Sequence, residues 1–489
     1  MTSQVAGAKV QSSAVASSIA VAGAVVTTLA SFLIAILVSQ ESKGFAGAFF
    51  TSTAVATILG NALALGTPTA LVYFMPQALE GDQPSPRGLI LQTLRPVFAL
   101  SCLVGVAVFF LAAPFAELVA DERVQEITTL VRAFSPAIPA WAVTAGLLGA
   151  TRGLGSMSPT VVVSQVMRPG GQILAIGALF LRGSPTALEV GLAWMVPVVL
   201  TMLAAFFAVM RLGGFTGAAS SAVSSADFWE FARPRSLANA LQIALERIDV
   251  IFVQALLGAD AAGVYGALTR YIAAGNFLIF AVAQAVSVTL RRAIAAANFG
   301  RAGDILRQTT AWLVLAAWPY FLIVALKPEP LADLLNGAFV AEAGILSILA
   351  VGMMVSAAAG PIDLTLLMLG KPTLSLIGVV VAIVTDIALL FALTPSFGLA
   401  GAAVAWSVSV VAQNLLASYF VRRHSGLTTP SKAWFIAGVI ALLAAVPISL
   451  ATPNTFLGLV LAGLIAGAIL VGGVLVNRST FFATPIKPA

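Results

Sequence analysis

The sequence is poor in the residues from which most catalytic and metal-binding sites are built. Its 489 residues include one cysteine, Cys102, and one histidine, His424, and only 9% of them are charged. A single cysteine excludes an intrachain disulfide and a cysteine-based metal site, and a single histidine has no partners for a triad or a ligand set. The chain also lacks a Walker A motif, so we expect no ATP hydrolysis. We therefore predict no catalytic residues, no metal and no cofactor.

Apolar residues, by contrast, are abundant and occur in long runs. Hydrophobic residues make up 60% of the chain and its mean hydropathy is +1.03, whereas a soluble domain has about 45–50% apolar and about 25% charged residues. The apolar runs last about 20 residues without polar alternation, which excludes a membrane β-barrel. Because lipid requires every backbone polar group to be paired internally, we predict an all-α polytopic membrane protein.

A hydropathy window of about 19 residues predicts about fourteen membrane-spanning helices. Their expected limits are 15–39, 45–74, 89–113, 125–150, 159–181, 189–210, 229–257, 263–290, 308–326, 341–369, 374–394, 398–420, 433–451 and 456–476. Two of the connections are very short, LGKPT at 369–373 and TPSFG at 394–398.

The distribution of lysine and arginine predicts the orientation of these helices. With the N-terminus in the cytoplasm, sixteen of the 25 basic residues fall in inner loops and tails, four in outer loops and five within spans. This positive-inside bias predicts that both termini lie in the cytoplasm. It also accounts for a pI of about 9.8 without nucleic acid as a partner. The N-terminal MTSQVAGAKVQSS is expected to be a short cytosolic tail, since it lacks the features of a signal peptide.

Similar segments recur at a nearly constant offset, which indicates an internal repeat. GFAGAF at Gly44 matches GVYGAL at Gly263, and the span that ends at Arg211 matches the span that ends at Arg423. A duplicated unit of six spans gives two lobes in the same orientation, related by an axis along the membrane normal, with a binding cavity between them. The predicted organisation is an N-lobe at 1–212, a Ser-rich cytoplasmic linker at 213–227, a C-lobe at 228–424, and two further helices with a cytoplasmic tail at 425–489.

Two stretches carry a resemblance to a known family. RIDVIFVQALLGADAAGVYGALTRY (247–271) contains Asp249, Gly263 and Tyr265, and the segment at 369–406 ends in the Gly398–Ala403 turn, GLAGAA. With the six-plus-six-plus-two layout, these stretches resemble the Wzx-like polysaccharide transporter branch of the MOP superfamily. That superfamily also contains MATE drug exporters and lipid II flippases.

The resemblance implies a flippase of the bacterial cytoplasmic membrane. Its substrate would be a polyprenyl-diphosphate-linked oligosaccharide, such as an O-antigen-like repeat unit, moved by alternating access with its tail in a groove formed by the last two spans. The implied partners are this glycan, membrane lipid, and polysaccharide polymerase or glycosyltransferases, and we expect a monomer. The alternatives are a cation-coupled multidrug exporter, a lipid II flippase, or a membrane glycosyltransferase or polymerase, although the outer loops are short for such an enzyme.

Charges within ALERIDVIF (244–252) mark the candidate site. At 100° per residue, Glu246 and Asp249 lie on one polar stripe of span seven with Asn239 and Gln242, and Gln284 belongs to a similar stripe on span eight. Ionisable groups in a membrane are costly, and they usually face protein or a water-filled cavity. The stripe therefore either lines the transport path or forms a structural ion pair, for example with Arg270.

The embedded charges divide into a basic and an acidic set. Arginine binds phosphate through forked hydrogen bonds, so we expect the arginines to form a cationic cavity for the diphosphate. The carboxylates are expected to serve ion coupling or gating. The basic set is Arg95, Arg132, Arg168 and Arg270, and the acidic set is Glu246, Asp249, Asp363 and Asp386. Arg95 alternatively extends toward the cytoplasmic surface.

Overall fold

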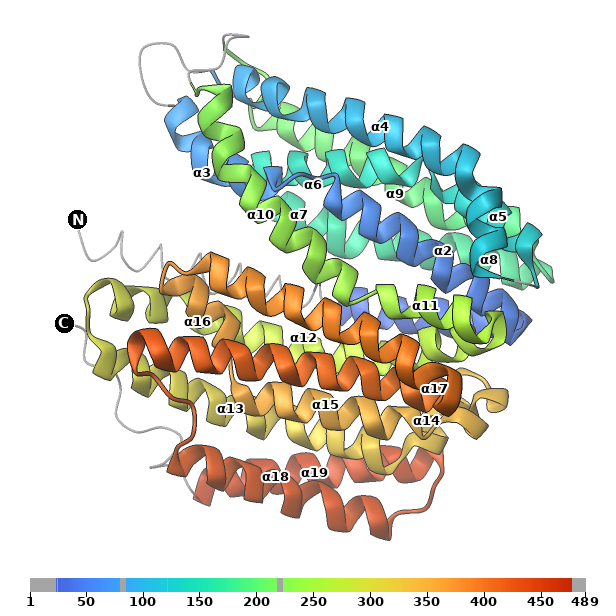
Figure 1. Ribbon diagram of the computed structural model, residues 1–489, viewed down its shortest axis with the longest axis vertical. Helices are drawn as coiled ribbons and strands as arrows, with labels where there is room; N and C mark the ends of the chain where they lie inside the picture. Colours follow the sequence, from blue (N-terminus) through green and yellow to red (C-terminus); the bar gives the residue numbers. More distant parts are fainter. Residues whose placement is uncertain (1–22, 24, 80–84, 121, 218–222, 477–489) are drawn as a thin grey trace. The chain divides into compact units, whose positions relative to one another are not determined.

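The computed structural model describes residue 23 and residues 25–79, 85–120, 122–217 and 223–476, and this part of the chain is helical and has no strand (Figure 1). The all-α class predicted from composition is therefore confirmed. Within the described residues, nine helices are long and apolar enough to cross a membrane. The first residues of the first predicted span, the N-terminal tail and the C-terminal tail lie outside the described part.

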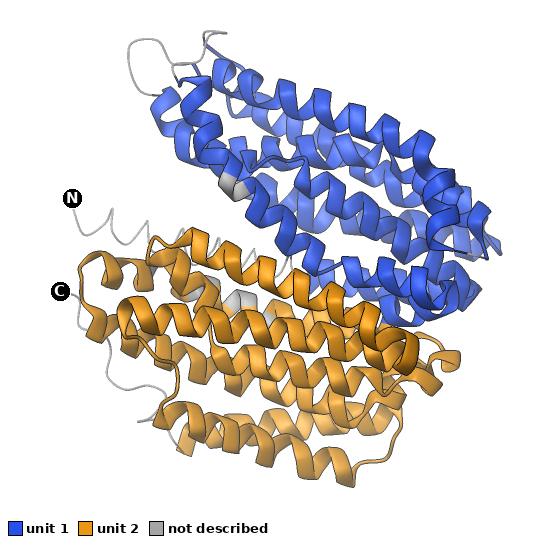
Figure 2. Ribbon diagram, viewed as in Figure 1, with its two compact units in different colours: residues 1–267 blue, residues 268–489 orange. Residues whose placement is uncertain are grey.

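The chain forms two compact units, residues 1–267 and residues 268–489 (Figure 2). The helices of the first unit follow one another closely. They are Val25–Glu41, α2 (Lys43–Ala62), α3 (Thr67–Leu79), α4 (Pro86–Val119), α5 (Val124–Phe134), α6 (Ala137–Gly153), α7 (Ser158–Val161), a π-helix (Val162–Met167), α8 (Arg168–Arg182), α9 (Ala187–Arg211), α10 (Ser225–Leu245), α11 (Ile248–Leu257) and the start of α12 (Ala259–Ala295).

The second unit continues from α12. It contains α13 (Phe299–Leu326), α14 (Pro328–Leu335), a 3-10 helix (Gly337–Glu342), α15 (Ile345–Ala359), α16 (Ile362–Met368), α17 (Pro372–Ser425), α18 (Lys432–Ala451) and α19 (Phe456–Val476). The helices of both units coincide closely with the predicted spans, and the count of fourteen spans stays a prediction.

Several predicted spans consist of two helices joined at a break. The span predicted at 229–257 is divided into α10 and α11, and the span at 341–369 is divided into α15 and α16 at Gly360-Pro361. The connection predicted at TPSFG lies at Gly398, where φ 57° and ψ −140° are not helical, so α17 consists of two helices that meet at this residue. Glycine adopts this backbone conformation without steric cost, so the chain passes from the first helix to the second with no longer loop.

In the first unit, α6 lies at the centre and packs against α2, α3, α4 and α9. Buried apolar side chains of these helices, among them Leu71, Ile90 and Leu147, pack together with Phe228 of α10. Helix α10 also contacts α2 and α3 directly, and α11 contacts α2 and α4. These contacts attach predicted span seven to the first unit, which ends at residue 267, and the predicted division into lobes and linker stays a prediction.

Helix α9 begins at a capping box on its predicted outer end. The Thr186 hydroxyl accepts from the Glu189 backbone N–H at 3.3 Å, and the Thr186 backbone N–H donates to the Glu189 carboxylate at 2.8 Å. These bonds satisfy donors that a helix N-terminus leaves free. The short loop before α9 is therefore fixed to the helix by its own side chains.

In the second unit, α13 packs against α15 and α18, and α19 packs on α18. The indole N–H of Trp318 donates to the carbonyl of Met354 at 2.9 Å, and that of Trp434 donates to Ala358 at 3.2 Å. These bonds join α13 and α18 to α15. They also give each indole N–H a hydrogen-bond acceptor, which lipid chains could not provide.

A buried lysine anchors the connection between α18 and α19. The Lys327 ammonium, at the end of α13, donates to the carbonyls of Thr452 and Pro453 at 2.5 and 3.1 Å and to the Asn454 side chain at 3.1 Å. The residue is only 1% exposed. All three donors of the ammonium are therefore used to hold the last two helices against α13.

Replacing Lys327 with methionine is expected to lower the stability of the protein by roughly 2–4 kcal/mol, since charge-assisted hydrogen bonds are lost and two carbonyls lose their donor. The melting temperature in detergent would measure this loss. Lys432→Met is the control, because Lys432 is exposed at the start of α18. Equal melting temperatures for the two variants would contradict the anchoring role.

Candidate functional site

The charges of ALERIDVIF lie at a break in the helix. Helix α10 ends at Leu245 and α11 begins at Ile248, so Glu246 and Arg247 form the joint. The backbone N–H of Arg247 donates to Ala244 at 3.0 Å, and Arg247 has φ −136°. The Glu246 carboxylate is hydrogen-bonded to the Gln242 side chain and attracted by Arg247. The joint thus places a carboxylate and a guanidinium together inside a predicted span.

A second irregular helix positions Arg168. The chain forms a π-helix over Val162–Met167 immediately before α8. Pro169 has no N–H to donate to the carbonyl four residues earlier, which belongs to Gln165. That carbonyl instead accepts from the Thr27 hydroxyl at 3.3 Å. The proline explains the local widening of the helix, and π-helical turns of this kind are common at functional sites.

Arg168 packs on an aromatic layer in the same unit. Its guanidinium carbon lies 4.2 Å from the centroid of the Trp141 ring. Trp141 stacks with Trp194 at 6.3 Å and 15°, and Trp194 contacts Phe134 at 4.6 Å. The Gln172 amide donates to the Trp194 carbonyl at 3.1 Å and fixes α8 against α9. Cation–π contact with tryptophan contributes about 2 kcal/mol or more when water is excluded.

Arg168 and Arg247 lie close enough for their charges to act on each other. Both side chains are half-buried. Within the described chain, neither guanidinium makes a hydrogen bond or a close ion pair, and Glu246 attracts Arg247 only at longer range. Two like charges at reduced dielectric repel each other, and an anion between them would relieve that repulsion. The arrangement is therefore suited to binding an anionic group with forked hydrogen bonds.

The other predicted arginines lie elsewhere. Arg95 on α4 is exposed. Arg132 on α5 is also exposed, donates to the carbonyl of Phe109 at 3.4 Å, and lies 5.6 Å from the centroid of that ring. Arg270 is half-buried on the part of α12 that belongs to the second unit. The structure does not bring Arg95 or Arg132 into contact with Arg168.

The predicted acidic residues are distributed over both units. Asp249 of α11 is 3% exposed and accepts from the Val250 backbone N–H at 2.9 Å. In the second unit, Asp363 accepts from the Ser375 hydroxyl at 2.5 Å, and Asp386 is fully buried on α17. Glu246 is exposed at the α10–α11 joint.

The predicted polar stripe is only partly described. Asn239 is exposed on α10, and Gln242 is half-buried beside Glu246. The Gln284 side chain lies outside the described part of the chain. Within the described residues, no group of three or more His, Cys, Asp or Glu could hold a metal ion.

Sequence reasoning missed three features of this site. It did not include Arg247 among the candidate arginines, and it assigned no role to Trp141 or Trp194. Tryptophan in membrane helices gathers at the interfaces, so two tryptophans inside spans were an available signal. The π-helix had a weaker signal, the Pro169-Gly170-Gly171 sequence that follows Arg168.

Comparison with known proteins identifies the fold. Residues 234–392, about a third of the chain, match the MatE family model. The structure is similar to lipid II flippase MurJ in an inward closed conformation, with TM-score 0.73, 14% identity, and coverage of 95% of this chain and 99% of MurJ. No curated protein matches the sequence.

Two multidrug transporters share this fold. An inward-facing multidrug resistance MATE family transporter of the MOP superfamily has TM-score 0.69 and 16% identity, and the similarity covers 82% of this chain and 94% of that one. The MATE multidrug transporter DinF-BH has TM-score 0.65 and 17% identity, with 86% of this chain and 95% of that one covered. At such identities the likeness establishes a MOP-type fold, as predicted, and leaves the substrate open.

Proposed function

We propose that this protein is a transporter of the MOP superfamily that flips a polyprenyl-diphosphate-linked oligosaccharide across the bacterial cytoplasmic membrane. One observation carries the proposal: Arg168 and Arg247 are half-buried, repel each other and form no salt bridge within the described chain. A diphosphate supplies the missing negative charge and accepts forked hydrogen bonds from both.

Each part of the site has a task in this mechanism. The diphosphate binds to the two arginines, and binding transfers the attraction of Arg247 from Glu246 to the substrate. Trp141 holds the Arg168 guanidinium in place, so less rotamer freedom is lost on binding. Asp249, Asp363 and Asp386, together with Glu246, carry the protons or cations that couple transport, and alternating access moves the headgroup across the membrane.

The extent of the structural similarity supports a lipid-linked substrate. MurJ, described as a lipid II flippase, covers 95% of this chain, compared with 82% and 86% for the two MATE transporters. Of these three proteins, MurJ is the one whose structure matches the largest share of this chain, and it is also the one described as acting on a lipid.

A cation-coupled multidrug exporter is the second candidate. The aromatic layer of Trp141, Trp194 and Phe134 favours it, because such rings stack on planar drugs, and DinF-BH is described as a multidrug transporter. The two arginines oppose it, since they repel cations.

Proteoliposomes distinguish the two candidates. A fluorescent polyprenyl-diphosphate oligosaccharide is added, the outer leaflet is quenched, and the protected fraction is followed with time. The matched control is a neutral glycolipid with the same tail and glycan but no diphosphate. We expect protein-dependent flipping of the diphosphate lipid at a rate at least about tenfold above the neutral lipid. Equal rates for both lipids, or transport of a planar aromatic cation alone under an ion gradient, would overturn the proposal.

A further inference from the structure

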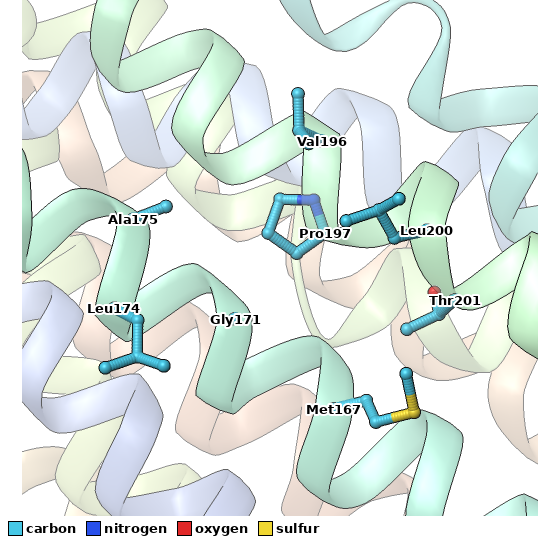
Figure 3. A pocket seen from close by; sticks show the side chains of 8 residues that line it. All are labelled: Met167, Gly171, Leu174, Ala175, Val196, Pro197, Leu200 and Thr201. Atoms are coloured by element: carbon cyan, nitrogen blue, oxygen red, sulfur yellow. The ribbon is translucent and has the colours of Figure 1, made fainter.

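An apolar groove lies between α8 and α9 in the first unit, with a volume of about 410 Å³ (Figure 3). We call it the α8–α9 groove. It is lined by Met167, Gly171, Leu174, Ala175, Val196, Pro197, Leu200 and Thr201. Leu174 is 76% exposed and Leu200 is 54% exposed, so the groove opens to the surroundings of the unit.

The chemistry of the groove suits a hydrocarbon. Thr201 is its one polar side chain, and its hydroxyl donates to the carbonyl of Val198 at 2.7 Å, so it offers no free donor. Gly171 forms the floor, because a side chain there would lie 3.1 Å from Pro197. A phosphate would find no side-chain donor here and a sugar at most the Thr201 oxygen as an acceptor, whereas an alkyl chain gives up no hydrogen bonds on entering the groove.

Arg168 lies on the same turn of helix as two residues that line the groove, Met167 and Gly171. Met167 directly precedes Arg168 in the chain, and Arg168 lies about 60° around α8 from Gly171. Gln172, next to Gly171, is bonded to the Trp194 carbonyl beneath the aromatic layer. One flank of α8 thus carries a cation for a diphosphate, and the adjoining flank carries an uncharged apolar surface.

We infer that the α8–α9 groove binds the first isoprene units of the polyprenyl tail while Arg168 holds the diphosphate. At roughly 30 Å³ for each carbon-sized group, the groove takes roughly a dozen carbons, and the rest of the tail lies in the bilayer. This inference rests on the proposed function. It assigns the tail to the first unit and not to the last two spans, α18 and α19.

Photo-crosslinking tests the inference on the unmodified protein. The probe is a polyprenyl-diphosphate oligosaccharide with a diazirine in its second isoprene unit. We expect labelled peptides from 158–211, and we expect excess unlabelled substrate, but not excess phospholipid, to remove the label. Labelling confined to 432–476, or competition by phospholipid alone, would overturn the assignment.

Filling the groove tests the same point through transport. Ala175→Phe is expected to slow flipping of a long-chain substrate about tenfold, and to leave transport of an analogue with the same headgroup and a methyl group in place of the isoprenoid tail nearly unchanged. Ala178→Phe is the matched control, because Ala178 is exposed on the same helix outside the groove.

The outcomes separate the inference from the proposed function. If Ala175→Phe leaves the long-chain rate unchanged while the wild type flips that lipid, the groove is not the tail site and the flippase proposal stands. If the wild type does not flip the long-chain lipid, the proposed function itself fails.

Discussion

Replacing Arg168 with alanine is expected to slow flipping of a polyprenyl-diphosphate oligosaccharide by at least about a hundredfold. The change removes two charge-assisted hydrogen bonds to the diphosphate, each contributing roughly 1.5–3 kcal/mol, and about 1.4 kcal/mol corresponds to a factor of ten. Arg168→Lys keeps the charge but cannot form the forked pair of hydrogen bonds or stack its flat guanidinium on Trp141. We therefore expect the flipping rate to fall about tenfold. Initial rates in proteoliposomes with matched amounts of folded protein would measure both effects.

Arg95→Ala is the control for this prediction. Arg95 is also an arginine within a predicted span, but it is exposed on α4 and not in contact with Arg168. Its replacement is expected to change the rate by less than about twofold. A wild-type rate for Arg168→Ala would leave the transport function intact and discard the arginine site, whereas equal losses in both variants would indicate a general effect of positive charge.

Alanine at Gly47 or Gly263 is expected to cause the largest loss of stability. Helix α2 crosses the start of α12 at these two glycines, where a side chain at Gly47 would overlap the Ala259 carbonyl and one at Gly263 would overlap the Lys43 carbonyl. Both obstacles are backbone atoms, which cannot rotate away. Overpacking of this kind costs roughly 3 kcal/mol or more. The fraction of monodisperse protein and its melting temperature in detergent would measure the effect.

Matched glycines elsewhere provide the control. A side chain at Gly170 of α8 or Gly463 of α19 would meet nothing within 4 Å, so alanine there is expected to be neutral or slightly stabilising. If Gly263→Ala melted like Gly170→Ala, the two helices would not cross as closely as described. The two matching segments of the sequence, GFAGAF and GVYGAL, are also the two segments that pack against each other at this crossing.

The positions of the helices were largely predictable from the sequence, because a membrane restricts the length and composition of a spanning segment. A span needs about 20 apolar residues whose backbone groups bond within the helix, so hydropathy alone located α9 and α18 to within a few residues. Breaks were harder to predict. The connection predicted at TPSFG is present, because the backbone of Gly398 is not helical. The span predicted at 229–257, however, was expected to be one helix, and it is broken at Glu246 and Arg247.

The candidate site was predictable only in part. An arginine beside Pro-Gly-Gly in an apolar run indicated Arg168, since embedded charges are rarely without a role. The same reasoning could not separate it from Arg132, which is also embedded and next to a helix break. The structure places Arg132 on an exposed face against Phe109 and Arg168 over Trp141. Arg247 is absent from the predicted set, since on a regular helix it would face away from Asp249, but the helix is broken at that residue.

The sequence by itself determined that this chain is a helical membrane protein, where most of its helices lie, and which charged residues fall within the predicted spans. These properties follow from composition and from runs of residues that are contiguous in the chain. Only the tertiary structure decided which charges meet. The contacts of Arg168 with Trp141 and Arg247 join residues far apart in sequence, and they depend on a π-helix and a broken helix that rotate side chains away from their regular positions. Hydropathy averages over a window and carries no information about that rotation.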